Sequence, residues 1–348
     1  MNRKRIILLI IIMLFTACIA LIIVAILAAQ KVKAPEASNV LSYPESFVED
    51  KYTPTIGVTF SPKTTESSDF LQFFTKATEA SNVIGWYGDI LQLNDLRQAP
   101  YSITDISKQN KLDTLAIVNY YSQGEKAVLR PLQENKDKYL AGMAQYVSKY
   151  NPKYFGIGIE VNWMYRDNPD LFNEFVGFFN EAAEKLKVIS PNTKIFTVFQ
   201  LEQMKGLQGG LYAKTNNEPV QWDLINRFPK ADVIAFTSYP GLIYKTPGDI
   251  PTDYYTSISQ NVLKPVIFTE IGWSRTTVAS GWISSPERQA EFINRFFNLT
   301  KDIKPDVVIW SFLYDPPSFN LAFNTMGLLN DNDETSPGLT AWKNHLQK

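Results

Sequence analysis

The segment PVIFTEIG, residues 265–272, decides the fold of this chain. It is short and almost continuously apolar, it is rich in β-branched side chains, and it carries a single carboxylate near its end. The segment VVIWSFL, residues 307–313, has the same character. Runs of this kind are typical of parallel β-strands that are covered on both faces.

Eight such runs follow one another along the chain, and amphipathic stretches with apolar residues at three- and four-residue spacing separate them. The predicted strands are 55–62, 83–90, 112–121, 154–162, 194–200, 232–239, 265–272 and 307–315. The predicted helices include 67–80, 135–149, 170–188 and 287–299. This order predicts an α/β fold, a (β/α)8 TIM barrel over residues 52–348. An open doubly wound sheet is the alternative, but residues 60–63 lack the glycine-rich turn that such folds carry after their first strand.

The N-terminus has the pattern of a membrane anchor. Residues 1–5 form a basic flank with three positive charges, and residues 6–29 contain no charged side chain. A helix of that length extends about 36 Å, enough to cross a bilayer. The basic flank predicts a single-pass protein of the cell membrane with its C-terminal domain extracytoplasmic. Residues 30–51 read as a linker. A cleaved signal peptide and a lipoprotein signal at Cys18 are the alternatives.

Scarce residue types limit the possible chemistry. The only histidine is His345, close to the C-terminus, and the only cysteine is Cys18, inside the apolar run. These counts argue against Ser-His-Asp and Cys-His mechanisms, His/Cys zinc sites and a disulfide within the domain. The net charge of −1 does not favour nucleic acid as a partner. We therefore expect chemistry by carboxylates, amides, hydroxyls and aromatic rings, without metal or cofactor.

Polar and aromatic side chains gather at the C-terminal ends of the predicted strands, where a TIM barrel has its active site. Planar polar groups bind sugar hydroxyls, and Trp and Tyr rings stack on the apolar faces of sugars. The sequence therefore predicts a carbohydrate partner. The predicted substrate-binding residues are Trp86, Asn119, Tyr120, Asn162, Trp163, Glu202, Tyr239, Trp273, Trp310 and Asp315.

Glu160 and Glu270 are the predicted catalytic residues. Each ends an apolar strand, where an unpaired charge is costly to bury. The alternative is a structural ion pair, for which Arg166 and Arg275 are the nearest basic residues in sequence. Because the fourth and seventh strands lie across the barrel from each other, the two carboxylates would face one another. A retaining glycosidase needs two carboxyl groups about 5–5.5 Å apart.

The segments FTEIGWS around Glu270, DVIAFTSYPG around Tyr239 and VIWSFLYD around Trp310 resemble the clan A superfamily of retaining glycoside hydrolases. The first is similar to the nucleophile segment of β-glucanases, and the second to a segment of endo-β-1,4-galactanases. The resemblance implies a TIM barrel with Glu160 as acid/base and Glu270 as nucleophile. It also implies that Tyr239 approaches the nucleophile and that Trp310 is the aromatic floor under the sugar.

The sequence departs from clan A immediately before Glu160. The family's asparagine, which binds the sugar 2-hydroxyl, is replaced by Ile159. Period-two alternation would place Asn162 on the side of Glu160, where it could substitute. The predicted function is a retaining glycoside hydrolase for a β-linked polysaccharide or oligosaccharide of galactan, glucan or mannan type. A transglycosylase with the same residues, and a catalytically inactive glycan-binding or envelope scaffold protein, remain the alternatives.

Overall fold

The computed structural model describes residues 52–119, 131–316, 322–330 and 332–346. No helix within these ranges is both long and apolar enough to cross a membrane. The predicted basic flank 1–5, membrane segment 6–29 and linker 30–51 lie outside the described residues.

The strands form one parallel sheet in the order β5-β4-β3-β2-β1-β9-β8-β7-β6. Only Thr197 separates β5 from β6, so these two are halves of one strand that pairs with β4 on one side and β7 on the other. The sheet therefore closes as an eight-stranded barrel, as the sequence predicted. The strands are β1 (Thr55–Thr59), β2 (Val83–Asp89), β3 (Asp113–Asn119), β4 (Tyr154–Ile157), β5 (Lys194–Phe196), β6 (Val198–Gln200), β7 (Ile234–Ser238), β8 (Val266–Ile271) and β9 (Val307–Trp310).

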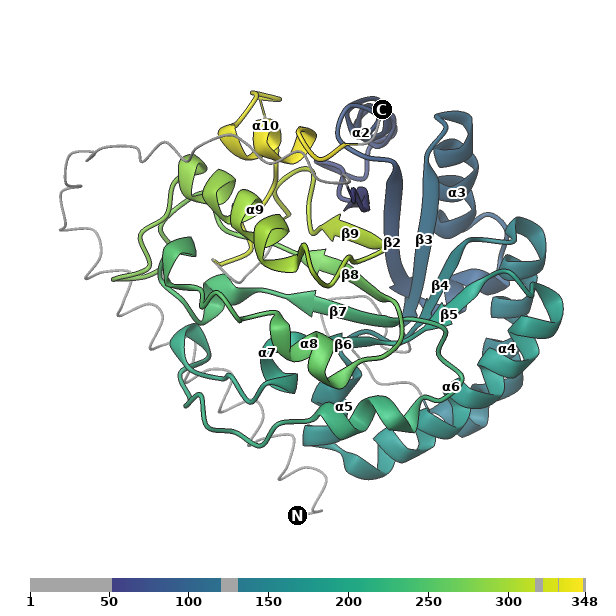
Figure 1. The fold of residues 1–348 in the computed structure, drawn as a ribbon. Helices are drawn as coiled ribbons and strands as arrows, with labels where there is room; N and C mark the ends of the chain where they lie inside the picture. The colour runs from purple at the N-terminus through teal and green to yellow at the C-terminus, as the bar shows by residue number, and fades with distance from the viewer. Residues whose placement is uncertain (1–51, 120–130, 317–321, 331, 347–348) are drawn as a thin grey trace, which may run out of the picture.

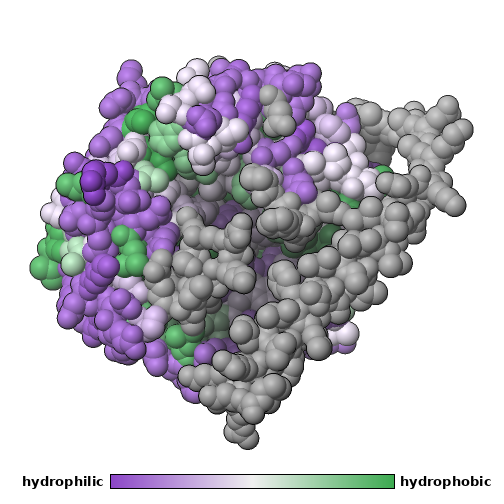
Figure 2. Space-filling model, turned by 180° about the vertical axis from the view of Figure 1, so that it is seen from behind, coloured by the Kyte–Doolittle hydropathy of each residue, from purple (hydrophilic) through white to green (hydrophobic). Residues whose placement is uncertain are grey.

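Helices surround the strands (Figure 1). They are α2 (Ser67–Ala77), α3 (Ala99–Gln109), α4 (Leu132–Tyr150), α5 (Val161–Asp167), α6 (Pro169–Ile189), α7 (Leu201–Met204), α8 (Thr256–Asn261), α9 (Pro286–Thr300) and α10 (Pro337–Lys343). The four helices predicted above correspond to α2, α4, α6 and α9, and their ends differ by at most three residues. The surface seen from behind is mostly hydrophilic where it is described, with separate hydrophobic patches (Figure 2).

Alternation along the strands separates two apolar layers. The barrel interior is filled by one cluster, and the layer between strands and helices holds another, larger one. On β9, for example, Val307 and Ile309 lie in the interior while Val308 and Trp310 face the helices. The interior cluster is Val83, Leu115, Ile117, Tyr154, Phe196, Val198, Val233, Ala235, Ile267, Val307 and Ile309.

Two irregularities interrupt this alternation at the C-terminal end of the barrel. In β8, Phe268 lies opposite Phe236 but Glu270 lies opposite Thr237, so β8 has one extra residue there. The β8–β9 ladder contains the same shift. After β4, Gly158 and Glu160 adopt positive φ angles of 84° and 49°. Both irregularities adjoin a predicted catalytic glutamate.

Candidate active site

Thr237 of β7 links the two predicted catalytic glutamates. Its hydroxyl donates a hydrogen bond to Oε1 of Glu160 at 2.6 Å, and its backbone lies opposite Glu270 in the β7–β8 ladder. Glu160 arrives from the end of β4 and Glu270 from β8, and both side chains are partly buried. The structure therefore brings together the carboxylates that the sequence analysis paired.

Glu270 is held by a hydrogen-bonded chain of neutral hydroxyls. The hydroxyl of Tyr239 donates to Oε2 of Glu270, and the same hydroxyl lies 2.8 Å from Oγ of Ser311. The charge of Glu270 and burial both raise the pKa of Tyr239, so this phenol stays protonated and acts as a donor. The contact expected of Tyr239 from the family resemblance is thus present.

Burial raises the pKa of both glutamates. It raises the pKa of Glu160 to about 7, and the hydrogen bond from Thr237 counteracts part of this effect. It raises the pKa of Glu270 to about 8, with a further increase from the negative charge of Glu160 and a decrease from the Tyr239 hydrogen bond. Because each charge repels the other, the two protons are lost in two steps that belong to the pair. One proton is therefore held by the pair near neutral pH.

No basic side chain forms an ion pair with either glutamate among the described residues. Arg166 pairs with Asp167 at 2.6 Å, and Arg275 pairs with Asp315. The structural ion pair considered as an alternative is therefore absent at Glu160 and Glu270. The site is a buried dyad of carboxyls supported by neutral donors.

Two aromatic side chains, Trp163 and Tyr212, lie close to Glu160. A hydrogen bond from Trp163 contributes to lowering the pKa of Glu160, so this predicted substrate-binding residue does adjoin the acid. Trp163 also contacts the ring of Tyr212, with centroids 6.1 Å apart. The charge of Glu160 contributes to raising the pKa of Tyr212, which places that phenol close to the acid as well.

Asn119 ends β3 on the interior side, two residues after Ile117 of the interior cluster. Its Oδ1 atom is buried and accepts no hydrogen bond from the described residues. Asn119 therefore remains a candidate substrate contact. The next predicted contact, Tyr120, lies outside the described residues.

Two tryptophans predicted to contact sugar face the helices instead. Trp86 is 5% exposed and Trp310 is 0% exposed, and both belong to the outer cluster. The indole N–H of Trp310 donates to the carbonyl of Met326 at 2.8 Å. The prediction overlooked that Trp86 alternates with Tyr87, and Trp310 with Ile309, so that each tryptophan points outward. Trp310 is therefore not the floor of the site.

Asn162 is also a structural residue. It is fully buried, and its amide makes hydrogen bonds of 2.9 and 3.0 Å with the backbone of Gln200. Alternation fails here because the chain leaves the strand at Gly158, and Asn162 lies in the first turn of α5. Ile159 packs against the interior cluster, so neither residue supplies an amide in place of the family's asparagine.

Glu202 and Asp315 do not face the site either. Glu202 is 0% exposed, and its carboxylate accepts hydrogen bonds from side chains and one backbone N–H. Its donors are Gln200 Nε2, Ser238 Oγ (2.9 Å), Tyr239 N (3.0 Å) and Tyr254 Oη (2.7 Å). Asp315 joins two loops, because it pairs with Arg275 and accepts the backbone N–H of Gly327 at 2.8 Å.

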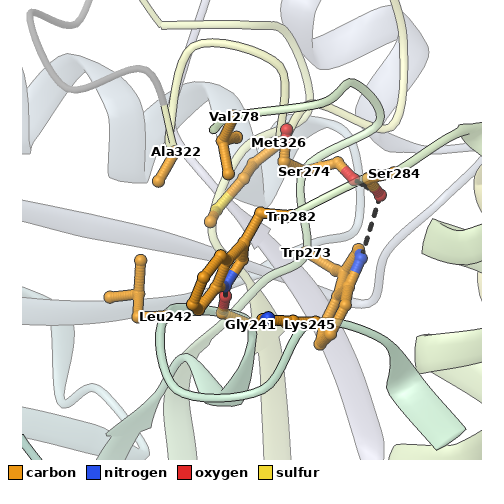
Figure 3. Close-up of a pocket in the computed structure, with 10 residues that line it drawn as sticks. All are labelled: Gly241, Leu242, Lys245, Trp273, Ser274, Val278, Trp282, Ser284, Ala322 and Met326. Carbon is orange, nitrogen blue, oxygen red and sulfur yellow. Dashed lines mark hydrogen bonds between the residues drawn. The ribbon is translucent and has the colours of Figure 1, made fainter. Parts of the chain in front are cut away.

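Trp273 lines a separate pocket beside the site. It is 3% exposed and stacks on Phe292. Its Nε1 donates a hydrogen bond to Ser284 Oγ at 3.0 Å, which is drawn as a dashed line in Figure 3. Neither Glu160 nor Glu270 lines this pocket, and the role of Trp273 as a substrate contact stays a prediction. The lining residues are Gly241, Leu242, Lys245, Trp273, Ser274, Val278, Trp282, Ser284, Ala322 and Met326.

The sequence analysis missed four residues of the site: Tyr87, Tyr212, Thr237 and Ser311. Three of them could have been found by counting in steps of two from interior residues. Tyr87 follows Val83, Thr237 follows Ala235, and Ser311 follows Ile309. Tyr212 ends a short 3-10 helix, Gly210–Tyr212, outside the strands and has no such signal. The described residues contain no cluster of three or more His, Cys, Asp or Glu side chains that could hold a metal ion.

No known protein-family profile and no curated protein sequence matches this chain. Solved structures do resemble it. An exo-β-1,4-mannosidase from an Opitutaceae bacterium superposes with a TM-score of 0.62 at 11% identity, over 84% of this chain and 59% of the mannosidase. The chain thus spans less than two thirds of the mannosidase's length.

Two shorter structures match over nearly their whole length. The GH53 catalytic domain from Ignisphaera aggregans has a TM-score of 0.56 at 18% identity, over 85% of this chain and 97% of that domain. The glycoside hydrolase family 17 β-1,3-glucanosyltransferase from Rhizomucor miehei has a TM-score of 0.56 at 14% identity, over 82% of this chain and 96% of the transferase. The chain therefore has the same barrel fold as these three proteins, and a TIM barrel is the fold that its sequence resemblance implied.

Proposed function

We propose that this chain is a retaining glycoside hydrolase that cleaves a β-linked polysaccharide or oligosaccharide. Glu270 is the nucleophile and Glu160 the acid/base. The observation that carries the proposal is the buried pair of carboxyls, linked through Thr237 and free of cationic partners among the described residues. A structural role would favour paired charges, because isolated buried carboxylates are costly.

The reaction would proceed by double displacement. Glu160 gives its proton to the leaving glycosidic oxygen while a Glu270 oxygen attacks the anomeric carbon, which forms a glycosyl ester and releases the first product. Glu160, now ionised, takes a proton from water, and the resulting hydroxyl attacks the anomeric carbon and releases Glu270. Tyr239 donates to Glu270 in the free enzyme and again when the ester bond breaks and the carboxylate re-forms.

The protonation states constrain this mechanism. Attack requires an ionised Glu270 and a protonated Glu160. In the free protein the pKa of Glu270 is raised to about 8 and that of Glu160 to about 7. The reactive form needs the one remaining proton on Glu160, whereas in the free protein Glu270 has the higher pKa, so that proton must lie on Glu160 when the substrate is attacked. We expect a bell-shaped activity profile with its maximum near pH 7–8 rather than in the acid range.

The solved structures of the same fold support a β-linked substrate of mannan or glucan type. The mannosidase is described as an exo-β-1,4 enzyme and the glucanosyltransferase as a β-1,3 enzyme. The second description also keeps transglycosylation as a candidate, because transfer differs from hydrolysis only in the acceptor that attacks the ester.

A panel of β-linked polysaccharides and aryl β-glycosides tests the proposal. We expect the wild type to release product from at least one of them and Glu270→Gln to release none. Glu134→Gln, at an exposed position of α4, is the matched control and should keep full activity. Binding of a glycan without turnover in wild type and variant alike would instead favour the scaffold protein.

We also propose that residues 6–29 anchor the protein as a single-pass membrane protein with the barrel outside the cell. The support is the uncharged run behind a basic flank. Protease added to intact cells should release the barrel. Mature protein that begins near Gln30 would instead indicate a cleaved signal peptide.

A further inference from the structure

The direction in which Glu270 points depends on the bulge in β8. Ile267 lies in the barrel interior and Phe268 in the outer layer. Strict alternation from Phe268 would place Glu270 outside, against the helices. Instead Ile271 lies in the outer layer and Glu270 receives a hydrogen bond from Tyr239. The extra residue between Phe268 and Glu270 therefore turns the carboxylate toward the site.

A bulge removes backbone groups from the ladder, and these groups then need other partners. The hydroxyl of Tyr87 supplies one, because it donates to the carbonyl oxygen of Thr269, the residue before Glu270. Tyr87 belongs to β2, and β1 and β9 lie between β2 and β8 in the sheet. The hydrogen bond thus spans the barrel interior, where the ring of Tyr87 packs against the interior cluster.

The sequence of β2 makes room for this ring. A Cβ atom on Gly85 would lie 2.8 Å from the hydroxyl oxygen of Tyr87, so a side chain there would displace it. The charge of Glu270 contributes to raising the pKa of Tyr87, which agrees with a phenol close to the nucleophile that remains a donor.

We infer that Tyr87 is a positioning residue, whose hydroxyl fixes the β8 bulge through Thr269 and thereby aims Glu270 into the active site. The Tyr239 hydroxyl donates a hydrogen bond to the carboxylate of Glu270, and the Tyr87 hydroxyl donates one to the backbone carbonyl of the preceding residue, Thr269. The inference rests on the proposed function only for its catalytic consequence, because the contact itself is a property of the barrel.

Tyr87→Phe removes the hydroxyl alone. Tyr101→Phe is the matched control, since Tyr101 is buried in the outer layer and donates to the carbonyl of Leu93 at 2.7 Å. Hydrogen exchange measured by mass spectrometry reports how stably the β8 bulge is held, and it needs no substrate. We expect exchange of the segment 266–272 to rise at least tenfold in Tyr87→Phe and to stay unchanged in Tyr101→Phe.

Kinetic measurements on the aryl glycoside that is cleaved fastest then test whether Glu270 keeps its orientation. We expect kcat to fall roughly 10- to 100-fold in Tyr87→Phe with KM nearly unchanged, because the lost alignment matters in the transition state. Tyr101→Phe should remain within about twofold of wild type, as expected for a purely structural hydrogen bond.

Hydrogen exchange and kinetics together distinguish a failure of this inference from a failure of the proposed function. Unchanged exchange of segment 266–272 in Tyr87→Phe would overturn the inference whatever the activity. Faster exchange with wild-type kcat would show that Tyr87 fixes the bulge without aiming Glu270, which also overturns the positioning role. Faster exchange in a protein that cleaves no glycoside would refute the proposed function but leave the contact with the bulge established.

Discussion

The Thr237 hydroxyl donates a 2.6 Å hydrogen bond to Oε1 of Glu160, although 77 residues separate the two in sequence. The donor comes from β7 and the acceptor from the turn after β4, so the contact crosses the mouth of the barrel. Because the backbone of Thr237 also lies opposite Glu270 in the β7–β8 ladder, this one residue adjoins both glutamates. Their shared burial is the origin of their raised pKa values.

Tyr239→Phe should lower kcat by about 10- to 100-fold, because one preorganised donor to the reacting carboxylate is lost. The Tyr239 hydrogen bond lowers the pKa of Glu270, so its removal raises that pKa. Since Glu270 must be ionised to attack, the acid limb of the pH–kcat/KM profile should move to higher pH. Tyr255→Phe, whose hydroxyl contacts Ser238 at 3.1 Å, is the control. An acid limb that does not move would show that Tyr239 does not tune the nucleophile.

The double variant Glu160→Gln/Glu270→Gln should be more stable than the wild type at high pH. The folded pKa values of about 7 and 8 lie above the ordinary value of 4.5, so the folded state holds protons that the unfolded state has released. Stability therefore is greatest below about pH 4.5 and decreases as pH rises through 7–8. Thermal unfolding should give similar Tm values at pH 5 and a variant Tm several degrees higher at pH 9. Parallel Tm curves would contradict the raised pKa values.

Glu202→Ala should destabilise the barrel by about 3–5 kcal/mol, because it leaves buried donors without their acceptor. These donors include Gln200 at the end of β6, Ser238 at the end of β7 and Tyr254 shortly before α8, so a local rearrangement of one segment cannot give all of them a new acceptor. Urea unfolding measures the loss. Glu174→Ala, at an exposed position of α6, should change stability by less than about 0.5 kcal/mol. A loss for Glu202→Ala no larger than that of Glu174→Ala would refute the role assigned to Glu202.

A fragment that begins near Lys51 should fold and keep its Tm in the presence of a chelator. The described residues offer no cluster of metal-ligating side chains, and the hydrogen bonds around Glu160, Glu202 and Glu270 come from protein groups. Differential scanning calorimetry with and without EDTA measures the effect. A decrease in Tm of several degrees would reveal a metal site.

The sequence predicted the barrel and the closeness of Glu160 and Glu270 because both depend on local patterns. Buried parallel strands are continuous apolar runs, and a carboxylate at the end of such a run stands out, as Glu270 does. Strict alternation, however, would place the side chain of Glu270 on the outer face of β8. The bulge turns this side chain toward the site, and nothing in the segment PVIFTEIG indicates that bulge. The same applies to Asn162, where the positive φ angle of Gly158 ends the alternation.

The substrate-binding residues were harder to predict, because the type of a residue and its place in the sequence do not reveal the direction in which its side chain points. Trp86 and Trp310 have the aromatic rings that suit a sugar, yet they alternate with interior residues and pack against helices. Glu202 follows closely after a strand, in the first turn of α7, but its carboxylate is held by Ser238, Tyr239 and Tyr254, which are distant in sequence. Such long-range contacts depend on the closed barrel and are not encoded in any local pattern.

Azide rescue of Glu160→Ala tests the central claim most directly, namely that Glu270 attacks and Glu160 transfers the proton. On a 2,4-dinitrophenyl β-glycoside the leaving group needs no proton, so this variant should release a burst of dinitrophenolate and then stall as the glycosyl ester. Added azide should restore turnover and yield the β-glycosyl azide, while Glu270→Ala should give no burst. An α-glycosyl azide from Glu160→Ala, or a β-glycosyl azide from Glu270→Ala, would contradict the assigned roles.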